Sequence, residues 1–266
     1  MNYIAGSVSD VGIKRKNNQD SLYYALAEYQ GEKLAYTVIC DGMGGFSKGE
    51  LASAEVLTTF ENWFRKRLPE ILREGFSAEL LREEWYSLAE AENSRVSEYA
   101  SINRLKMGTT LTAALFLGDQ YYIIHVGDCR LYEIRDSEVL QLTHDHPVTQ
   151  REIDNGLLSP EDAETDSRQH ILLQCLGAGR EIAPDFVVGT IATYLSAKAM
   201  WLTRNTTVGG YPLLGMLMPA LFNAILVGWE LSVYIGGGTP TAIPCGDLER
   251  ILGAAREAFP GAVEWT

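Results

Sequence analysis

Three aspartates of this chain stand where a carboxylate could hold a hard cation. Asp20 follows the polar run Asn-Asn-Gln, Asp41 follows the apolar run Thr-Val-Ile-Cys and precedes Gly42, and Asp128 follows an apolar run that ends at Gly127. A strand fixes a carboxylate at its end, and a glycine lets its own carbonyl approach a metal ion because no side chain stands in the way. An isolated Asp-Gly pair is also typical of a hairpin turn, so both interpretations stay open at this level.

The elements that must position these acids follow from the spacing of apolar residues. Short aromatic and β-branched runs predict strands at 3–8, 21–26 and 34–40, and residues 108–142 predict consecutive hairpins. Apolar residues three and four apart predict helices over 49–99, divided in two by Pro69 and Gly75. Short helices are expected at 146–156 and 159–165. Strands, a helix pair, strands and helices in this order favour an α+β fold with mostly antiparallel sheets.

Ordered motifs around the three aspartates resemble those of the metal-dependent PP2C-type serine/threonine protein phosphatases, and in the fifth motif their bacterial members. The motifs are Asp10 to Asp20, Cys40 to Gly45 with Gly49-Glu50 and Ala52-Ser53, Met107 to Thr110, His125 to Arg130, and Leu142 to His146 with Gly156 to Glu161. The resemblance covers residues 1–187. It implies a β-sandwich flanked by helices, with two or three Mn²⁺ or Mg²⁺ ions at one end.

The resemblance also implies a role for each site residue. Asp41 would bridge two metals, the Gly42 carbonyl would ligate one of them, and Asp128 would serve a third, weaker site. Asp20 would hold water at the metals, and Arg15 would bind the phosphate as a planar bidentate donor. Water made acidic by two cations would attack phosphorus in line, without a protein nucleophile. Phosphorylated proteins are then the expected substrates, and a cognate Ser/Thr kinase is an expected partner.

The chain departs from the family pattern after Asp185. The family continues with an apolar strand ending in Ser-Asp-Gly and, later, with Asp-Asn, and both of these aspartates bind metal. This chain has no Ser-Asp-Gly and no acidic residue between Asp185 and Glu230. We therefore expect an incomplete sandwich and impaired catalysis. The alternatives are a non-catalytic domain that binds phosphoproteins or a metal, and a composite chain without a single function.

The C-terminal residues differ in composition from the rest. Residues 188–232 are predicted to form an apolar segment that resembles a piece of a bacterial membrane protein for uptake of vitamins or queuosine precursors. The uncharged stretch 210–229 has the length of a membrane span, although Pro212, Pro219 and Asn223 weaken that interpretation. Residues 233–266 contain a glycine-rich motif similar to that of radical-SAM enzymes of the coproporphyrinogen oxidase type.

Charge and cysteine usage narrow the class of protein further. The 266 residues carry a formal net charge of −13, which argues against nucleic-acid backbones as partners. The four cysteines are scattered, and the N-terminus lacks a basic region followed by an apolar run, so we expect a cytoplasmic protein, with membrane contact through 210–229 as a further possibility. The four histidines show no metal-ligand spacing along the chain, and His125 is expected to be a strand residue.

Overall fold

The structure is a computed structural model. It describes residues 3, 5–13, 15–43, 48–135 and 138–191, and the backbone of two short strands at Lys198–Leu202 and Ile225–Val227.

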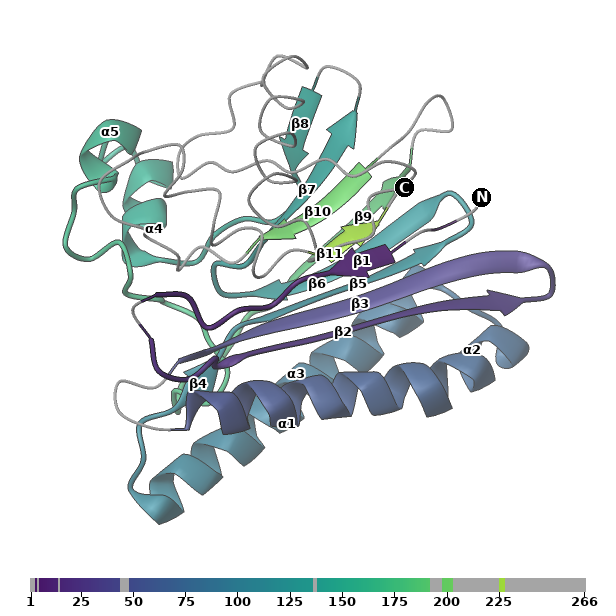
Figure 1. Cartoon of the computed structure of the whole chain (residues 1–266), viewed down its shortest axis with the longest axis horizontal. Helices are drawn as coiled ribbons and strands as arrows, with labels where there is room; N and C mark the ends of the chain where they lie inside the picture. Colours follow the sequence, from purple (N-terminus) through teal and green to yellow (C-terminus); the bar gives the residue numbers. More distant parts are fainter. Residues whose placement is uncertain are drawn as a thin grey trace.

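The described strands form two antiparallel sheets that pack face to face (Figure 1). The larger sheet has the order β2 (Asp20–Tyr29), β3 (Glu32–Met43), β5 (Leu111–Leu117), β6 (Gln120–Val126) and β9 (Asp185–Thr190), and the two-residue β4 (Gly108–Thr109) pairs with the end of β3. The smaller sheet has the order β1 (Ala5–Ser7), β11 (Ile225–Val227), β10 (Lys198–Leu202), β7 (Arg130–Arg135) and β8 (Glu138–Gln141).

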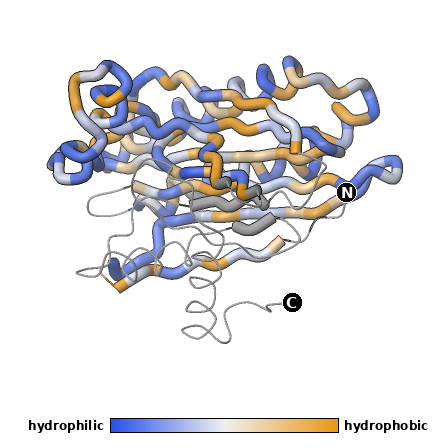
Figure 2. The backbone as a smooth tube through the Cα atoms, turned by 90° about the horizontal axis from the view of Figure 1, so that it is seen from above, coloured by the Kyte–Doolittle hydropathy of each residue, from blue (hydrophilic) through white to orange (hydrophobic). Residues whose placement is uncertain are grey.

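Strand β3 explains how the layers are held together. Successive side chains of a strand point to opposite faces of its sheet. Tyr36 and Val38 therefore pack against the helices, whereas Ala35 and Ile39 pack against the second sheet. Because both faces of β3 are covered, its sequence is an almost continuous apolar run, and hydrophobic residues recur through the strands and helices in Figure 2.

A layer of helices covers the outer face of the larger sheet (Figure 1). It consists of α1 (Gly49–Asn62), one π-helical turn at Trp63–Arg67, α2 (Leu68–Glu74) and α3 (Ala78–Asn103). Two short helices, α4 (Val148–Asp154) and α5 (Pro160–Ala163), lie on the other side of the sheets (Figure 1). The predicted α+β sandwich flanked by helices is confirmed in these residues.

The break between the two predicted helices occurs at Gly75 alone. Gly75 ends α2 with φ of +127°, which glycine adopts more readily than other residues, and the Ser77 side chain caps α3 by accepting from the Leu80 N–H at 3.1 Å. Pro69, which was expected to mark this break together with Gly75, lies in the first turn of α2, where the missing N–H of proline is tolerated. The π-helical turn just before it keeps the path from α1 to α2 helical.

Residues beyond the predicted domain end at 187 also join the sheets. Strand β9 crosses this position, and β10 and β11 come from the segment 188–232. β11 lies inside the stretch 210–229 that was predicted as a possible membrane span, and it pairs with β1 and β10. The rest of that stretch and residues 233–266 lie outside the described residues. Among the described residues, no helix is both long and apolar enough to cross a membrane.

Candidate metal centre

Asp20 and Asp41 face each other across the first hairpin of the larger sheet. They are direct partners in the register of β2 and β3. Asp41 is 4% exposed, its N–H donates to Thr110 Oγ1 at 2.8 Å, and its carbonyl accepts from the Thr110 N–H at 3.0 Å. Like charges directly opposite each other destabilise a sheet pair. A bound cation would remove this repulsion.

Gly42 lies where only a residue without a side chain fits. Its N–H donates to the Gln19 carbonyl at 3.1 Å, and a Cβ atom at this position would collide with the backbone carbonyls of Gln19 and Gly49. The same Gln19 carbonyl accepts from Ser53 Oγ at 2.6 Å. These contacts tie the end of β3 to the start of β2 and to α1, so the backbone beside Asp41 is held rigidly.

Arg15 reaches this network through Gln19. Its Nη1 donates to Gln19 Oε1 at 3.1 Å, and Gln19 Nε2 in turn donates to Glu50 Oε2 at 3.2 Å. The pKa of Glu50 is lowered by a hydrogen bond from its own backbone N–H and by the Gln19 contact. The exposed guanidinium of Arg15 therefore lies on the solvent side of the motif that contains Asp20.

Asp128 approaches the same place from the end of β6. It is 3% exposed, and its neighbour Cys129 contacts Thr110 Oγ1 at 3.0 Å. Burial raises the pKa of the Cys129 thiol well above its ordinary value, and the charges of Asp41, Asp128 and Asp20 raise it further. Thr110 Oγ1 contacts both the Asp41 N–H and the Cys129 thiol, so the structure places Asp128 near the Asp20–Asp41 pair although Asp20 and Asp128 are 108 positions apart in the sequence.

Clustered carboxylates, a glycine carbonyl and a rigid backbone are the donor set that hard divalent cations prefer. The residues present therefore fit Mn²⁺ or Mg²⁺. Of the predicted site residues, Asp20, Asp41, Gly42 and Asp128 come together at one end of the sheet, and Arg15 lies beside them through Gln19. Thr110, which holds both Asp41 and Cys129, had been noted only as part of a motif.

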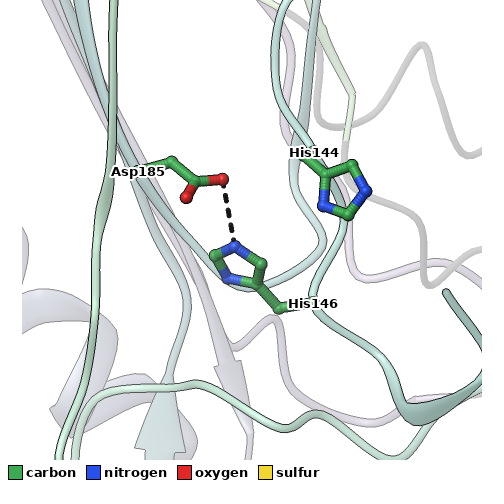
Figure 3. A group of neighbouring side chains, drawn as sticks. All are labelled: His144, His146 and Asp185. Carbon is green, nitrogen blue, oxygen red and sulfur yellow. Dashed lines mark hydrogen bonds and ion pairs between the residues drawn. The ribbon is translucent and has the colours of Figure 1, made fainter. Parts of the chain in front are cut away.

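A second group of polar side chains was missed in the sequence. His144, His146 and Asp185 place one ligand atom each within 4.8 Å of one another (Figure 3). His146 Nε2 lies 3.2 Å from Asp185 Oδ2, and His144 Nε2 lies 3.1 Å from Asp154 Oδ2. Asp185 belongs to β9 and is 39 positions from His146 in the sequence, so spacing along the chain gave no signal for this group.

Known proteins are similar to this chain in sequence and in fold. Residues 13–183 match the family described as protein phosphatase 2C. The chain belongs to the protein phosphatase 2C family. It is 32% identical over 188 residues to the protein phosphatase PhpP of Streptococcus pneumoniae, and the match covers 69% of this chain and 71% of that protein.

A second protein phosphatase 2C relative is much longer than the matched part. The serine/threonine protein phosphatase PstP of Mycobacterium tuberculosis is 32% identical over 178 residues, which is 66% of this chain but 31% of PstP. The chain thus spans about a third of that relative. These relatives give no support to the two resemblances seen in the C-terminal residues, which stay predictions.

Solved protein phosphatase 2C structures extend the likeness beyond residue 187. The PstP structure of M. tuberculosis has a TM-score of 0.63 at 26% identity and covers 85% of this chain and 96% of that one. The catalytic domain of PstP in complex with two manganese ions has a TM-score of 0.59 at 27% identity.

Proposed function

We propose that this chain hydrolyses phosphoserine and phosphothreonine in proteins with the help of Mn²⁺ or Mg²⁺. The observation that carries the proposal is that Asp20 pairs with Asp41 at one end of the larger sheet, and that Thr110 contacts both Asp41 and Cys129, the residue after Asp128. Membership of the protein phosphatase 2C family and the manganese ions in the PstP relative support it.

We assign each site residue a role in this reaction from its position. Asp41, the Gly42 carbonyl and Asp128 would hold the cations, and Asp20, on the strand opposite Asp41, would orient water toward the phosphate. Arg15, exposed beside Gln19, would bind two phosphate oxygens through its planar guanidinium. When bound, the cations supply the acidification of water and the neutralisation of charge on the phosphoryl group.

The full chain with a phosphothreonine peptide tests this proposal. We expect phosphate release that needs Mn²⁺ and stops with a chelator, and we expect Asp41→Ala to reduce it to the metal-free background. Glu28→Ala is the matched control, because Glu28 is exposed on the same strand as Asp20, roughly 27 Å further along it. Equal release by the parent chain and Asp41→Ala would contradict the proposal.

A second candidate function is binding without catalysis. The observation that favours it is the absence of Ser-Asp-Gly and of any acidic residue between Asp185 and Glu230. In this case the chain binds Mn²⁺ or a phosphoprotein and releases no phosphate. Mn²⁺ binding that depends on Asp41, without turnover of the peptide, is the result that distinguishes this candidate.

Two finer parts of the proposal concern the cellular setting. A cognate Ser/Thr kinase is the class of enzyme that would supply phosphorylated substrates to this site. A cytoplasmic location, with membrane contact through residues 210–229, is proposed from composition alone. Fractionation of cells that contain the full chain tests the location, and recovery in the membrane fraction would support the contact.

A further inference from the structure

The peptide that leads into Asp128 is held by two histidines. The Gly127 N–H donates to His146 Nδ1 at 3.0 Å, and the Gly127 carbonyl accepts from the His146 backbone N–H at 2.9 Å. His125 Nε2 lies 3.0 Å from the same carbonyl. Gly127 has φ of +118°, and a Cβ at this position would collide with Thr110. The backbone before Asp128 therefore has little freedom to move.

The hydrogen bonds of His146 fix where its proton lies. Since Nδ1 accepts from the Gly127 N–H, the proton of the neutral ring is on Nε2, which donates to Asp185 Oδ2 at 3.2 Å (Figure 3). A cation bound by His144, His146 and Asp185 would need the lone pair of Nε2. The proton would then have to move to Nδ1, where the Gly127 N–H already points. The group meets the distance requirement of a metal site but carries the wrong tautomer for one.

The residue before His146 holds the other side of Asp128. Asp145 accepts from Arg130 Nη2 at 2.6 Å, and both side chains of this ion pair are buried. Asp145 thus binds Arg130, and His146 binds Gly127. Asp128 lies between these two bound residues in the sequence. Asp185, on β9, accepts the hydrogen bond from His146 Nε2. This contact keeps the proton on Nε2, so Nδ1 stays unprotonated and can accept from Gly127.

We propose that His146, oriented by Asp185, is a positioning residue that sets the cation affinity of the site at Asp128 by holding the backbone N–H of Gly127, the residue before Asp128. The inference rests on the proposed function, because it takes Asp128 as a cation ligand. The physical basis is general: groups that orient a metal ligand through hydrogen bonds contribute about 10- to 100-fold to metal affinity.

Mn²⁺ binding to the full chain, followed by calorimetry, tests the inference with the metal alone as probe. We expect His146→Ala to weaken the weaker class of sites by about 10-fold or more. The amide oxygen of Asn can take the place of Nδ1 and accept from the Gly127 N–H, so His146→Asn should remain within about 3-fold of the parent. Gln places its amide where Nε2 lies and cannot reach Gly127, so His146→Gln should resemble His146→Ala. A general loss of packing would not separate Asn from Gln in this way.

His144→Ala is the matched control, because His144 belongs to the same group but does not contact Gly127. We expect its Mn²⁺ affinity to equal that of the parent. An affinity loss as large as that of His146→Ala would identify the group itself as a cation site and overturn the inference. Parent-like binding by His146→Ala would also overturn it. If His146→Ala does not fold, equal affinities of His146→Asn and His146→Gln overturn it instead.

Failure of the proposed function has a different signature. A parent chain that binds no Mn²⁺ removes the proposed function, and this inference falls with it. A parent chain that binds Mn²⁺ with affinities insensitive to His146 removes the inference alone.

Discussion

Individual carboxylates in this chain have two kinds of surroundings. Asp145 and Asp166 each lie 2.6 Å from an arginine nitrogen, so their charge is balanced within the protein. Asp20 and Asp41 face each other across two strands, and the charges of Asp41, Asp128 and Asp20 all raise the pKa of the Cys129 thiol. The first arrangement stabilises a fold, and the second favours binding of a cation.

The buried Arg130–Asp145 pair gives a prediction about stability. Asp145→Asn should lower the free energy of unfolding by about 3–5 kcal/mol, because the buried guanidinium loses the negative charge of Asp145. Glu61→Gln breaks an exposed pair with Arg65 and should cost less than about 1 kcal/mol. Urea unfolding measures both variants. Equal losses would show that the Arg130–Asp145 pair does not behave as a buried one.

His125 gives a prediction about pH. Burial lowers the pKa of His125 from 6.5 to about 4, so the folded state keeps this ring neutral while the unfolded state binds a proton below pH 6.5. Stability from this group is complete above pH 6.5 and is lost as the pH falls toward 4, by about 3 kcal/mol in total. Unfolding of metal-free protein at pH 7 and pH 4.5 measures the loss. His125→Asn should lose clearly less stability over this range, and an identical pH dependence would contradict the assignment.

At the scale of elements, the site depends on places where backbones come close together. The end of β3, the start of β2 and the first turn of α1 meet at Gly42, and β6 meets Thr110 at Gly127. Strand pairing alone brings the aspartates near each other, but these close contacts fix their orientation.

Gly42→Ala should therefore weaken Mn²⁺ binding as well as stability. The added methyl group has backbone atoms of Gln19 and Gly49 in its way, and overpacking of this kind costs about 1–3 kcal/mol. Gly156→Ala is the matched control, since Gly156 has φ of +69° and open space around it. It should lose about 1–2 kcal/mol from backbone strain but keep the Mn²⁺ affinity of the parent. Calorimetry separates the two, and unchanged affinity in Gly42→Ala would contradict the role of this contact.

Element-scale features were predictable where the sequence signal is local. Apolar runs separated by turn signals predicted the hairpins of 108–142, and the three- and four-residue spacing predicted the helices after Gly49. Pro69 was misjudged because a proline in the first turn of a helix costs little, and the preceding π-helical turn has no sequence signature. The contact between His146 and Asp185 was not predictable, since it depends on β9 pairing with β6 across 60 residues.

At the scale of the whole molecule, segments from both ends of the chain complete the smaller sheet. β1 pairs with β11, and β10 joins β11 to β7. The sequence suggested two differently built pieces, with a net charge of −12 before residue 188 and −1 after it. The described strands show that both pieces contribute to one sandwich, because β-pairing needs backbone groups and not a particular charge.

A chain ending at residue 187 should therefore aggregate. Without β10 and β11, one edge of β7 and one edge of β1 lose their partners, and unpaired strand edges promote association. Size-exclusion chromatography with light scattering compares this chain with the full chain. A monodisperse, thermally stable shortened chain would show that the C-terminal strands are dispensable.

The central claim is that Asp20, Asp41 and Asp128 form a site for divalent cations. Calorimetric titration of the full chain with Mn²⁺ tests it most directly, with Asp41→Ala as the comparison and Glu28→Ala as the control. The account predicts saturable binding by the parent and by Glu28→Ala, with loss of the tightest binding in Asp41→Ala. Absence of binding by the parent, or unchanged binding in Asp41→Ala, would contradict it.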